Sequence, residues 1–333
     1  MSRKRFTFAV LCYNHQEYIV EHLESIKYLI DSYGDDWEVD LVVNDDASTD
    51  NTVRYLSYWL NENFSIFNNV KKIFNSSNSG TCASVLNILE NVDTTRLKIT
   101  AGDDVYSYEN IFEHSSLSDN VSFSSGIPLI LTENFINESI KTSLEVISSH
   151  HIYRGKKLID RFIFLSNNNA PNMFYNFKNL TDPDTISFLK DYDVVEDWPL
   201  QVAIAEKNPD SIFTLSNKVF VYYRRTSGSS YITAEGRFFN DKVKVYNYLI
   251  ERSDNFFSRF VLENRLWLFR KKNKFLNVFF NIAFYRFVFG FFLKIVTIFR
   301  SYSSFKKELL LVSHKEHYSL LKNRADYFME DKS

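Results

Sequence analysis

The stretch that decides the fold is Leu97-Lys98-Ile99-Thr100-Ala101-Gly102-Asp103-Asp104. It begins as a short apolar run, which predicts a strand, and it ends in a glycine and two adjacent carboxylates. Open α/β folds bind ligands at the edge where their strands end. Carboxylate oxygens at such an edge suit Mg²⁺ or Mn²⁺ shared with substrate phosphates. A surface turn is the alternative, but the remainder of the N-terminal half favours the ligand site.

The segments before this stretch alternate between strand and helix patterns. Apolar runs at 6–12, 39–43, 70–74 and 96–100 predict strands, and helical spacing of apolar residues appears at 19–30, from about 51, and at 85–89. This alternation predicts a parallel sheet covered by helices on both faces. Neither a G-x-G-x-x-G fingerprint nor a Walker phosphate-binding loop is present, so the common dinucleotide and P-loop folds are excluded.

Three of the predicted strands end in polar clusters: Tyr13-Asn14, Asp45-Asp46 and Asp103-Asp104. Because the ends of parallel strands lie at one edge of a sheet, we expect these clusters to converge. Converging carboxylates repel one another unless a cation or a hydrogen-bonded ligand lies between them. The pattern therefore predicts a nucleotide and a divalent metal at this edge.

Four motifs resemble, in order and spacing, the signatures of family 2 glycosyltransferases. They are Leu11-Cys12-Tyr13-Asn14, the block 42–52 with Asp45-Asp46-Ala47-Ser48, Asn78-Ser79-Gly80 and Ala101-Gly102-Asp103-Asp104. Enzymes of that family have the GT-A fold, are inverting and use nucleotide-activated sugars. The resemblance covers about residues 5–230 and implies an α/β, mostly parallel sheet flanked by helices.

The resemblance also implies roles for single residues. It places Tyr13, with Leu11 and Asn14 beside it, near the nucleotide base, and Asp45 or Asp46 in contact with the base. It places Asp103 near the ribose or sugar, and Asp104, together with Asp103, as the ligands of Mn²⁺ or Mg²⁺ on the diphosphate. This sequence departs from the family pattern at two points: Ala47 replaces a glycine, and the segment 81–87 lacks a basic residue that could reach the nucleotide.

Glu196-Asp197-Trp198 marks the acceptor side of the predicted site. An inverting transfer needs a base for the acceptor hydroxyl, and a positioned carboxylate contributes roughly 10²–10⁴ in rate. The resemblance places the family's Glu-Asp motif here, so we expect Asp197 to be the base, Glu196 to orient the site and Trp198 to stack on a sugar ring. Asn172, in the polar segment 167–175, is expected to contact the acceptor. The alternative is that these acids cap a helix, Trp198 is core and the polar segment is an ordinary turn.

Arg224 and Arg225 lie in a segment, 221–230, that resembles the Tyr-Arg-x-x-x-x-Ser loop of the family. A guanidinium group binds phosphate oxygens in a bidentate manner, so either arginine is expected to stabilise the leaving diphosphate. Arginines paired with surface acids are the alternative.

Bulk properties set the remaining limits. The chain has 333 residues and a formal net charge of −2, so no general basic field favours nucleic acid. Two cysteines argue against a disulfide framework, and the N-terminal residues lack the apolar stretch of a signal peptide, so we expect a cytoplasmic location. We expect a GT-A domain at 1–235, with a nucleotide-sugar half at 1–110 and an acceptor half at 111–235, followed by a helical region at 236–333.

That helical region combines basic residues with an aromatic run at 275–293, which Arg286 interrupts and Lys294 ends. The run favours a helix lying in the interface of the inner face of the cell membrane over a helix that spans the membrane. A buried helical subdomain or a contact between copies of the chain is the alternative.

The combined expectation is a metal-dependent inverting glycosyltransferase. Its donor would be a nucleoside-diphosphate sugar, most simply a UDP sugar, and its acceptor a glycan or lipid-linked hydroxyl in bacterial surface polysaccharide (capsule or O-antigen) synthesis. Two alternatives remain: a nucleotidyltransferase that uses the same carboxylate edge, and a non-catalytic protein that binds a nucleotide sugar or glycan.

Overall fold

A computed structural model describes residues 3–132, 134–166, 170–225 and 235–332. Its N-terminal part contains a parallel sheet with the strand order β3-β2-β1-β4. The strands are β1 (Lys4–Cys12), β2 (Trp37–Asp45), β3 (Asn69–Phe74) and β4 (Leu97–Ala101). β1 and β2 are buried almost throughout, as expected for central strands covered on both faces. The predicted parallel sheet is confirmed.

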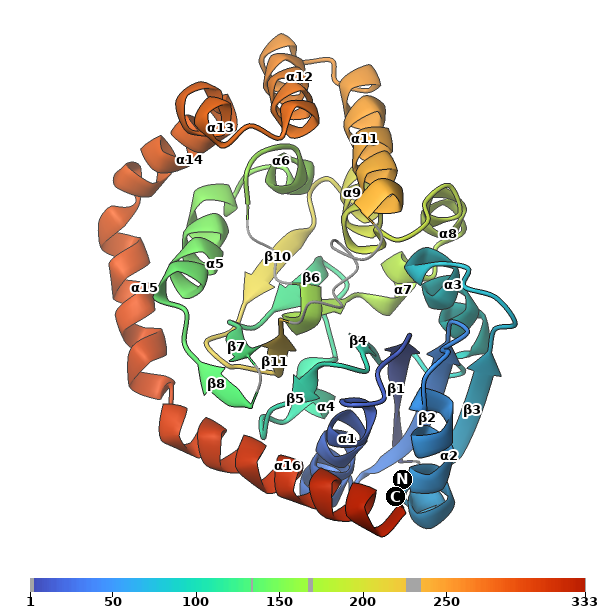
Figure 1. The fold of residues 1–333 in the computed structure, drawn as a ribbon. Coiled ribbons are helices and arrows are strands. Elements are labelled where there is room, and N and C mark those ends of the chain that lie inside the picture. Colours follow the sequence, from blue (N-terminus) through green and yellow to red (C-terminus); the bar gives the residue numbers. More distant parts are fainter. Residues whose placement is uncertain (1–2, 133, 167–169, 226–234, 333) are drawn as a thin grey trace.

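Helices cover both faces of this sheet, as Figure 1 shows. They are α1 (Ile19–Tyr33), α2 (Thr52–Asn63) and α3 (Thr81–Asn91), and each follows one strand. Leu23 of α1 and Leu56 of α2 share a core with Phe8 and Val10 of β1. Val85 of α3 belongs to a second core on the other face. The two cores fix the sheet and therefore the edge at which β1, β2 and β4 end.

The following segment, up to Arg224, adds two smaller sheets with the orders β5-β11-β7-β8 and β10-β6-β9. The strands are β5 (Val105–Tyr106), β6 (Val121–Ser125), β7 (Leu129–Thr132), β8 (Phe135–Asn137), β9 (Met173–Tyr175), β10 (Ile212–Leu215) and β11 (Val221–Arg224). The helices are α4 (Ile111–His114), α5 (Ile140–Tyr153), α6 (Leu158–Ile163), α7 (Phe177–Leu180), α8 (Pro183–Leu189) and α9 (Asp197–Lys207). β9 lies next to β4, so this part continues from the parallel sheet.

The C-terminal region is helical, as predicted, and it wraps around the outside of the molecule (Figure 1). Its helices are α11 (Glu235–Glu251), α12 (Phe256–Lys271), α13 (Lys274–Phe280), α14 (Ile282–Leu293), α15 (Ile295–Glu308) and α16 (Leu311–Lys332). α16 packs against α1, which returns the chain end to the N-terminal sheet. The boundary at 235/236 stays a prediction.

Among the residues that the structure describes, no single helix is long and apolar enough to cross a membrane. Helices α13 and α14 reach the necessary length and apolar composition only together, as a pair bent by 51°.

Candidate active site

The three polar clusters meet at the carboxyl edge of the parallel sheet. In the strand register, Cys12 lies opposite Asp45 and Leu11 opposite Ala101. The backbone N–H of Asp46 donates to the Cys12 carbonyl over 2.9 Å, and that of Gly102 donates to the Leu11 carbonyl over 2.8 Å. The sheet topology thus brings together the segments that the sequence placed at separate strand ends.

The loop after β1 is held by Asn14, whose φ is +56°. Its backbone N–H donates to Ser48 Oγ over 2.8 Å, and its Oδ1 accepts from the Thr49 N–H over 2.8 Å. Asn14 therefore ties the β1 loop to the β2 loop. Tyr13 is 43% exposed, so its ring is open to a ligand, whereas Leu11 is partly buried in β1. Nucleotide contacts by these three residues stay predictions.

The two aspartates at the end of β2 have different environments. Asp45 accepts from the N–H of Ser48 over 2.9 Å and also from its hydroxyl, and it remains the candidate for a base contact. Asp46 accepts from Asn75 Nδ2, Ser79 N and Gly80 N, each over 2.8 Å. The buried carboxylate of Asp46 thus holds the Asn78-Ser79-Gly80 turn, and a nucleotide contact by Asp46 stays a prediction.

The turn after β4 presents Asp103 and Asp104 differently. The side chain of Asp103 is 18% exposed, and its Oδ1 lies 4.0 Å from His15 Nε2. Asp104 is buried, and its Oδ1 accepts from the Arg224 N–H over 2.8 Å. Burial and the neighbouring Asp103 raise the pKa of Asp104 well above its usual value. A cation bound beside Asp104 would oppose both causes and favour its carboxylate form.

Arg224 is engaged inside the protein, and its predicted diphosphate contact stays a prediction. Its guanidinium is buried against Glu21 of α1, and its Nε donates to the Asp103 carbonyl over 2.6 Å. Glu21 also accepts from Tyr318 Oη over 3.1 Å and from Lys322 Nζ over 3.3 Å, both on α16. This buried network braces the Asp103-Asp104 turn from α1, β11 and α16. Arg225 is exposed, so its predicted diphosphate contact stays a prediction, and the loop residues 226–230 lie outside the described residues.

The donor set fits a divalent cation that is bound chiefly through a substrate. Among the residues the structure describes, no group of three or more His, Cys, Asp and Glu side chains could enclose a metal ion. Two adjacent carboxylates suffice where Mg²⁺ or Mn²⁺ takes its other ligands from phosphates and water. Asp103, the more exposed of the pair, and Asp104 would hold such an ion, and its charge would relieve their mutual repulsion.

The second acidic pair, Glu196 and Asp197, lies at the start of α9, where the resemblance placed it. Both side chains are partly buried, and burial together with the charge of Asp197 raises the pKa of Glu196 to about 8. The raised pKa favours the protonated form of Glu196. Asp197 lies in the first turn of α9, where the positive end of the helix stabilises a carboxylate that can act as a base.

Asp241 of α11 fixes the backbone just before this pair. Its Oδ2 accepts from the N–H groups of Asp193, Val194 and Val195 over 2.9, 2.7 and 3.1 Å. The Asp241 side chain is only 1% exposed, so it has no access to a substrate. Asp241 is thus a positioning residue for the Glu196-Asp197 segment.

A direct connection joins this segment to the carboxyl edge. Gly80, in the turn held by Asp46, has a φ of +91°, and a Cβ built on it would lie 2.3 Å from Asp193 Oδ1. The Cys82 N–H donates to the Asp193 carbonyl over 3.0 Å. Arg237 of α11 binds the Asp193 carboxylate through Nε over 2.6 Å and reaches Asn78 Oδ1 over 2.8 Å. Asp193 therefore fixes the Glu196-Asp197 segment against the Asn78-Ser79-Gly80 turn.

A cavity of about 410 Å³ opens beside Asp197. Its charged lining consists of Asp197, Lys242 and Arg265, and its apolar lining includes Trp198 and Phe164. Trp198 is only 8% exposed and its Nε1 donates to the Phe162 carbonyl, so the ring forms part of the cavity wall and core instead of an open platform. A sugar contact by the edge of this ring stays a prediction.

The structure gives Asn172 a role in holding the backbone, and its predicted contact with the acceptor stays a prediction. Its side chain is fully buried, its Nδ2 donates to the Val221 carbonyl over 2.9 Å, and its Oδ1 accepts from the N–H groups of Phe220 and Val221. Asn172 therefore anchors the start of β11. Residues 167–169 of the same polar segment lie outside the described residues.

Asp241, Arg237 and Glu21 were not identified from the sequence. Arg237 and Asp241 are four residues apart in a predicted helical region, so they share a face, but the sequence gives no indication of what that face contacts. Glu21 lies 203 residues from its partner Arg224. Only the folded chain identifies these partners.

Comparison with known proteins agrees with this geometry. Residues 7–114 match the model of Glycosyl transferase family 2. A search of curated proteins finds no match to the chain. Among solved structures, S. aureus TarS 1-349 in complex with UDP-GlcNAc shares 16% identity with a TM-score of 0.54, covering 96% of this chain and 90% of that chain.

Two further structures are similar. The mannosyltransferase PcManGT from Pyrobaculum calidifontis, in complex with GDP-Man and Mn²⁺, shares 13% identity with a TM-score of 0.51, covering 99% of this chain and 88% of that chain. A longer S. aureus TarS structure shares 18% identity with a TM-score of 0.51 and covers 79% of this chain. This chain spans 43% of the length of that longer protein.

The family match over residues 7–114 and the GT-A fold of the chain indicate a glycosyltransferase. The resemblance to family 2 glycosyltransferases lies in residues 7–114, as the motifs in the sequence indicated.

Proposed function

We propose that this protein transfers a sugar from a nucleoside-diphosphate sugar to a hydroxyl of a glycan or lipid-linked acceptor, with inversion at the anomeric carbon. The observation that carries the proposal is a continuous connection from the carboxyl edge of the parallel sheet to Asp197. At that edge, Asp46 accepts from the Gly80 N–H. The turn at Gly80 packs against Asp193, which lies four residues before Asp197. This connection links the proposed donor side to the proposed acceptor side. The nucleotide-sugar ligands of TarS and PcManGT support the donor class, and a UDP sugar is the first candidate.

The donor side binds the nucleotide through the loops that end β1, β2 and β4. Tyr13 offers an exposed ring for the base, and Asp45 offers an acceptor for its N–H groups or for ribose hydroxyls. Asp103 and Asp104 would hold Mn²⁺ or Mg²⁺, which when bound neutralises charge on the leaving diphosphate. Arg224, Glu21 and Tyr318 keep the Asp103-Asp104 turn in place.

On the acceptor side, Asp197 takes the proton of the acceptor hydroxyl. The hydroxyl oxygen then forms a bond to the anomeric carbon while the bond from that carbon to the diphosphate oxygen breaks. The raised pKa of Glu196 favours its protonated form, and Asp197 in the first turn of α9 is the proposed base. Lys242 and Arg265 line the same cavity, which suits an acceptor that carries a phosphate beside its sugar.

The proposed setting is bacterial surface polysaccharide synthesis, a capsule or an O-antigen, on the cytoplasmic side of the cell membrane. This setting rests on the family resemblance and on an acceptor cavity with basic groups.

Turnover of a panel of UDP and GDP sugars in the presence of a panel of glycan and lipid-linked acceptors, measured as nucleoside diphosphate released with and without Mn²⁺, tests the proposal. We expect one donor to be turned over by the parent and turned over roughly 10²–10⁴ times more slowly by Asp197→Asn. Donor binding should be the same in both proteins. A product that carries the nucleotide instead of the sugar, or binding without any turnover, would contradict the proposal.

A further inference from the structure

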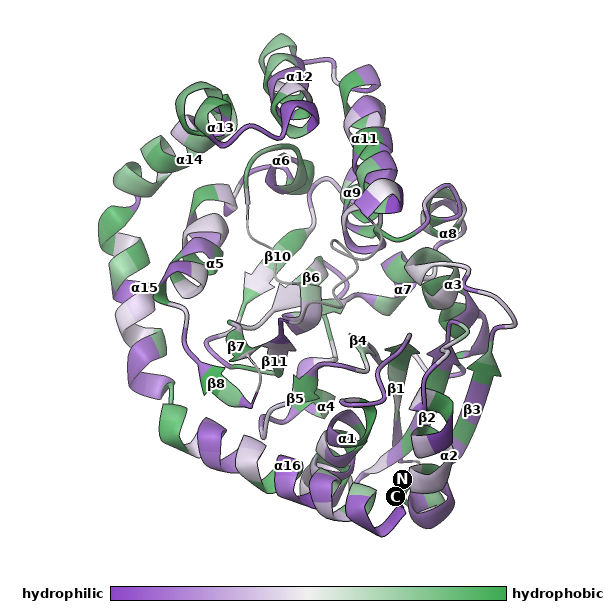
Figure 2. Ribbon diagram, in the orientation of Figure 1, coloured by the Kyte–Doolittle hydropathy of each residue, from purple (hydrophilic) through white to green (hydrophobic). Residues whose placement is uncertain are grey.

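Helices α13 and α14 present an apolar outer face that no described part of the chain covers. Its exposed side chains, here named the aromatic surface, are Phe275, Phe279, Phe280, Phe284, Phe289 and Phe292, which are 42–66% exposed. The inner face of α14 is apolar as well, because Ala283 is buried and Gly290 lies against Ile152 of α5. A helix that is hydrophobic on all sides is not typical of a surface in water. Figure 2 shows this hydrophobic colouring along α13 and α14.

The aromatic surface is held in a defined place on α12. Asn264 Nδ2 donates to the Phe280 carbonyl over 3.0 Å, and its Oδ1 accepts from the Ile282 N–H over 3.2 Å. These bonds fix the bend between α13 and α14. The exposure of the phenylalanines is therefore built into the fold.

Positive charge surrounds the aromatic surface. Residues 256–310 contain eleven Lys and Arg and two acids, Glu263 and Glu308, a net charge of +9, although the whole chain carries −2. Lys271, Lys274, Lys294 and Arg300 are exposed, and none of them pairs with an acid in the part of the chain that the structure describes. Exposed rings with unpaired cations around them match the interface of a bilayer that contains anionic lipids.

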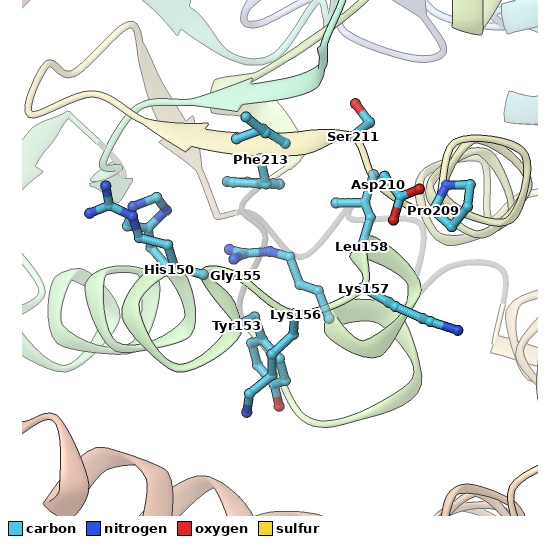
Figure 3. Close-up of a pocket in the computed structure, with 13 residues that line it drawn as sticks. His150, Tyr153, Gly155, Lys156, Lys157, Leu158, Pro209, Asp210, Ser211 and Phe213 are labelled. Atoms are coloured by element: carbon cyan, nitrogen blue, oxygen red, sulfur yellow. The ribbon is translucent and has the colours of Figure 1, made fainter.

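A second basic cluster lies at the end of α5, the helix against which α14 packs. A cavity of about 340 Å³ between α5 and α6 is lined by Arg154, Lys156 and Lys157, and Figure 3 shows both lysines on the side opposite Phe213. Because α5 packs against α14 and α15, these cations extend the positive field of the aromatic surface.

The aromatic surface adjoins the acceptor cavity. Arg265 and Phe269 of α12 line that cavity, and Phe164 in its wall lies 3.6 Å below the guanidinium of Arg286 of α14. A bilayer seated on the aromatic surface would therefore bring lipid headgroups near the cavity that contains Asp197.

We propose that the aromatic surface of α13 and α14 binds the headgroup and upper acyl region of an anionic lipid bilayer and so presents a lipid-linked acceptor to the cavity beside Asp197. Delivery of the acceptor rests on the proposed function, whereas binding to the bilayer is independent of it. The rings enter the acyl boundary, and the surrounding cations bind anionic headgroups.

Co-flotation with vesicles of phosphatidylcholine, with and without phosphatidylglycerol, tests this inference in the absence of any donor. The parent should bind the anionic vesicles at least about tenfold more strongly than the neutral ones, and added salt should weaken that binding. The double variant Phe289→Glu/Phe292→Glu should lose roughly tenfold or more in binding. Phe135→Glu is the matched control, because Phe135 on β8 is 67% exposed but lies outside the aromatic surface.

A second variant, Lys271→Glu/Lys274→Glu, should lose binding to anionic vesicles while its binding to neutral vesicles is unchanged. Equal vesicle binding by the parent and the phenylalanine variant would overturn the inference. A lipid-free dimer that the same two phenylalanine substitutions dissociate, with no vesicle binding by the parent, would assign the surface to a second copy of the chain instead. Equal binding of a nucleoside diphosphate by the parent and these variants would show that a loss of vesicle binding does not come from damage to the proposed donor site.

Discussion

At the residue scale, the environment of a side chain decides its role more than its identity does. Asp45 and Asp46 are adjacent and both buried, yet Asp46 accepts from Asn75, Ser79 and Gly80 while Asp45 accepts only from the neighbouring Ser48 among the hydrogen bonds described above. The same holds for Arg224 and Arg225, of which one is buried in an ion pair and the other is exposed. Sequence motifs name such pairs but do not say which member contacts a ligand.

Ala47 provides a test at this scale. Its φ is +63°, the left-handed region in which a Cβ is unfavourable. We predict that Ala47→Gly raises the free energy of unfolding by about 1 kcal/mol, because relief of strain exceeds the entropic cost of glycine. Urea denaturation measures the difference, and a variant less stable than the parent would contradict the assigned backbone conformation.

Glu196 provides a second test. Its pKa is raised to about 8 by burial and by Asp197, whereas in the unfolded chain it has the usual value near 4.5. The folded state therefore binds more protons between these pH values, so the contribution of Glu196 to stability falls as the pH rises from about 4.5 to about 8. Glu196→Gln should remove this part of the pH dependence. Urea unfolding of the parent and of Glu196→Gln at pH 5 and at pH 9 measures the effect. A difference in free energy of unfolding between the two proteins that is the same at both pH values would refute the prediction.

At the scale of elements, helices far along the chain brace the loops of the site. α11 supplies Asp241 to the backbone at 193–195, and α16 supplies Tyr318 to the Glu21–Arg224 pair. Strands and the first helices could be predicted because apolar runs and helical spacing are local: α1 begins at Ile19, as its spacing indicated. The bracing contacts could not, because no local pattern encodes partners tens to hundreds of residues apart.

Asp241→Ala tests the brace on the acceptor segment. Three N–H groups lose their acceptor, so we expect a loss of stability on the order of 3 kcal/mol. A shift of Asp197 by about 1 Å would lower kcat by up to about 10²-fold, with the KM for the donor nearly unchanged. Asp241→Asn, which keeps one side-chain oxygen, should recover part of the activity. Loss of donor affinity instead of kcat would mean that Asp241 supports a different part of the site.

Tyr318→Phe tests the brace from α16. The substitution removes one hydrogen bond to the buried Glu21 but leaves Arg224 and Lys322 in place, so the expected loss of stability is about 1 kcal/mol. Arg224→Ala should cost roughly 3–5 kcal/mol, since it leaves Glu21 buried without its main partner. Thermal unfolding of both variants measures the contrast, and equal losses would contradict the network.

At the scale of the whole molecule, the chain closes on itself. The parallel sheet forms the donor side, the segment with α9 forms the acceptor side, and α11–α16 wrap around both before α16 returns to α1 (Figure 1). The order of motifs along the sequence was sufficient to identify the GT-A fold, since each motif follows its own strand. The second half was less predictable: the helix start at Glu196 and Asp197 was predicted, but the burial of Asn172 and Trp198 by the packing of β11 and α6 was not.

The central claim is that the acidic residues from separate segments form one site with a donor side and an acceptor side. Calorimetric titration of the parent, Asp103→Asn and Asp197→Asn with UDP and GDP, with Mn²⁺ and after its removal by a chelator, tests the claim most directly. We predict that one diphosphate binds the parent, that Asp103→Asn or removal of the metal weakens binding about tenfold or more, and that Asp197→Asn leaves binding unchanged. Equal affinity in the parent and Asp103→Asn, or no binding of either diphosphate by the parent, would contradict it.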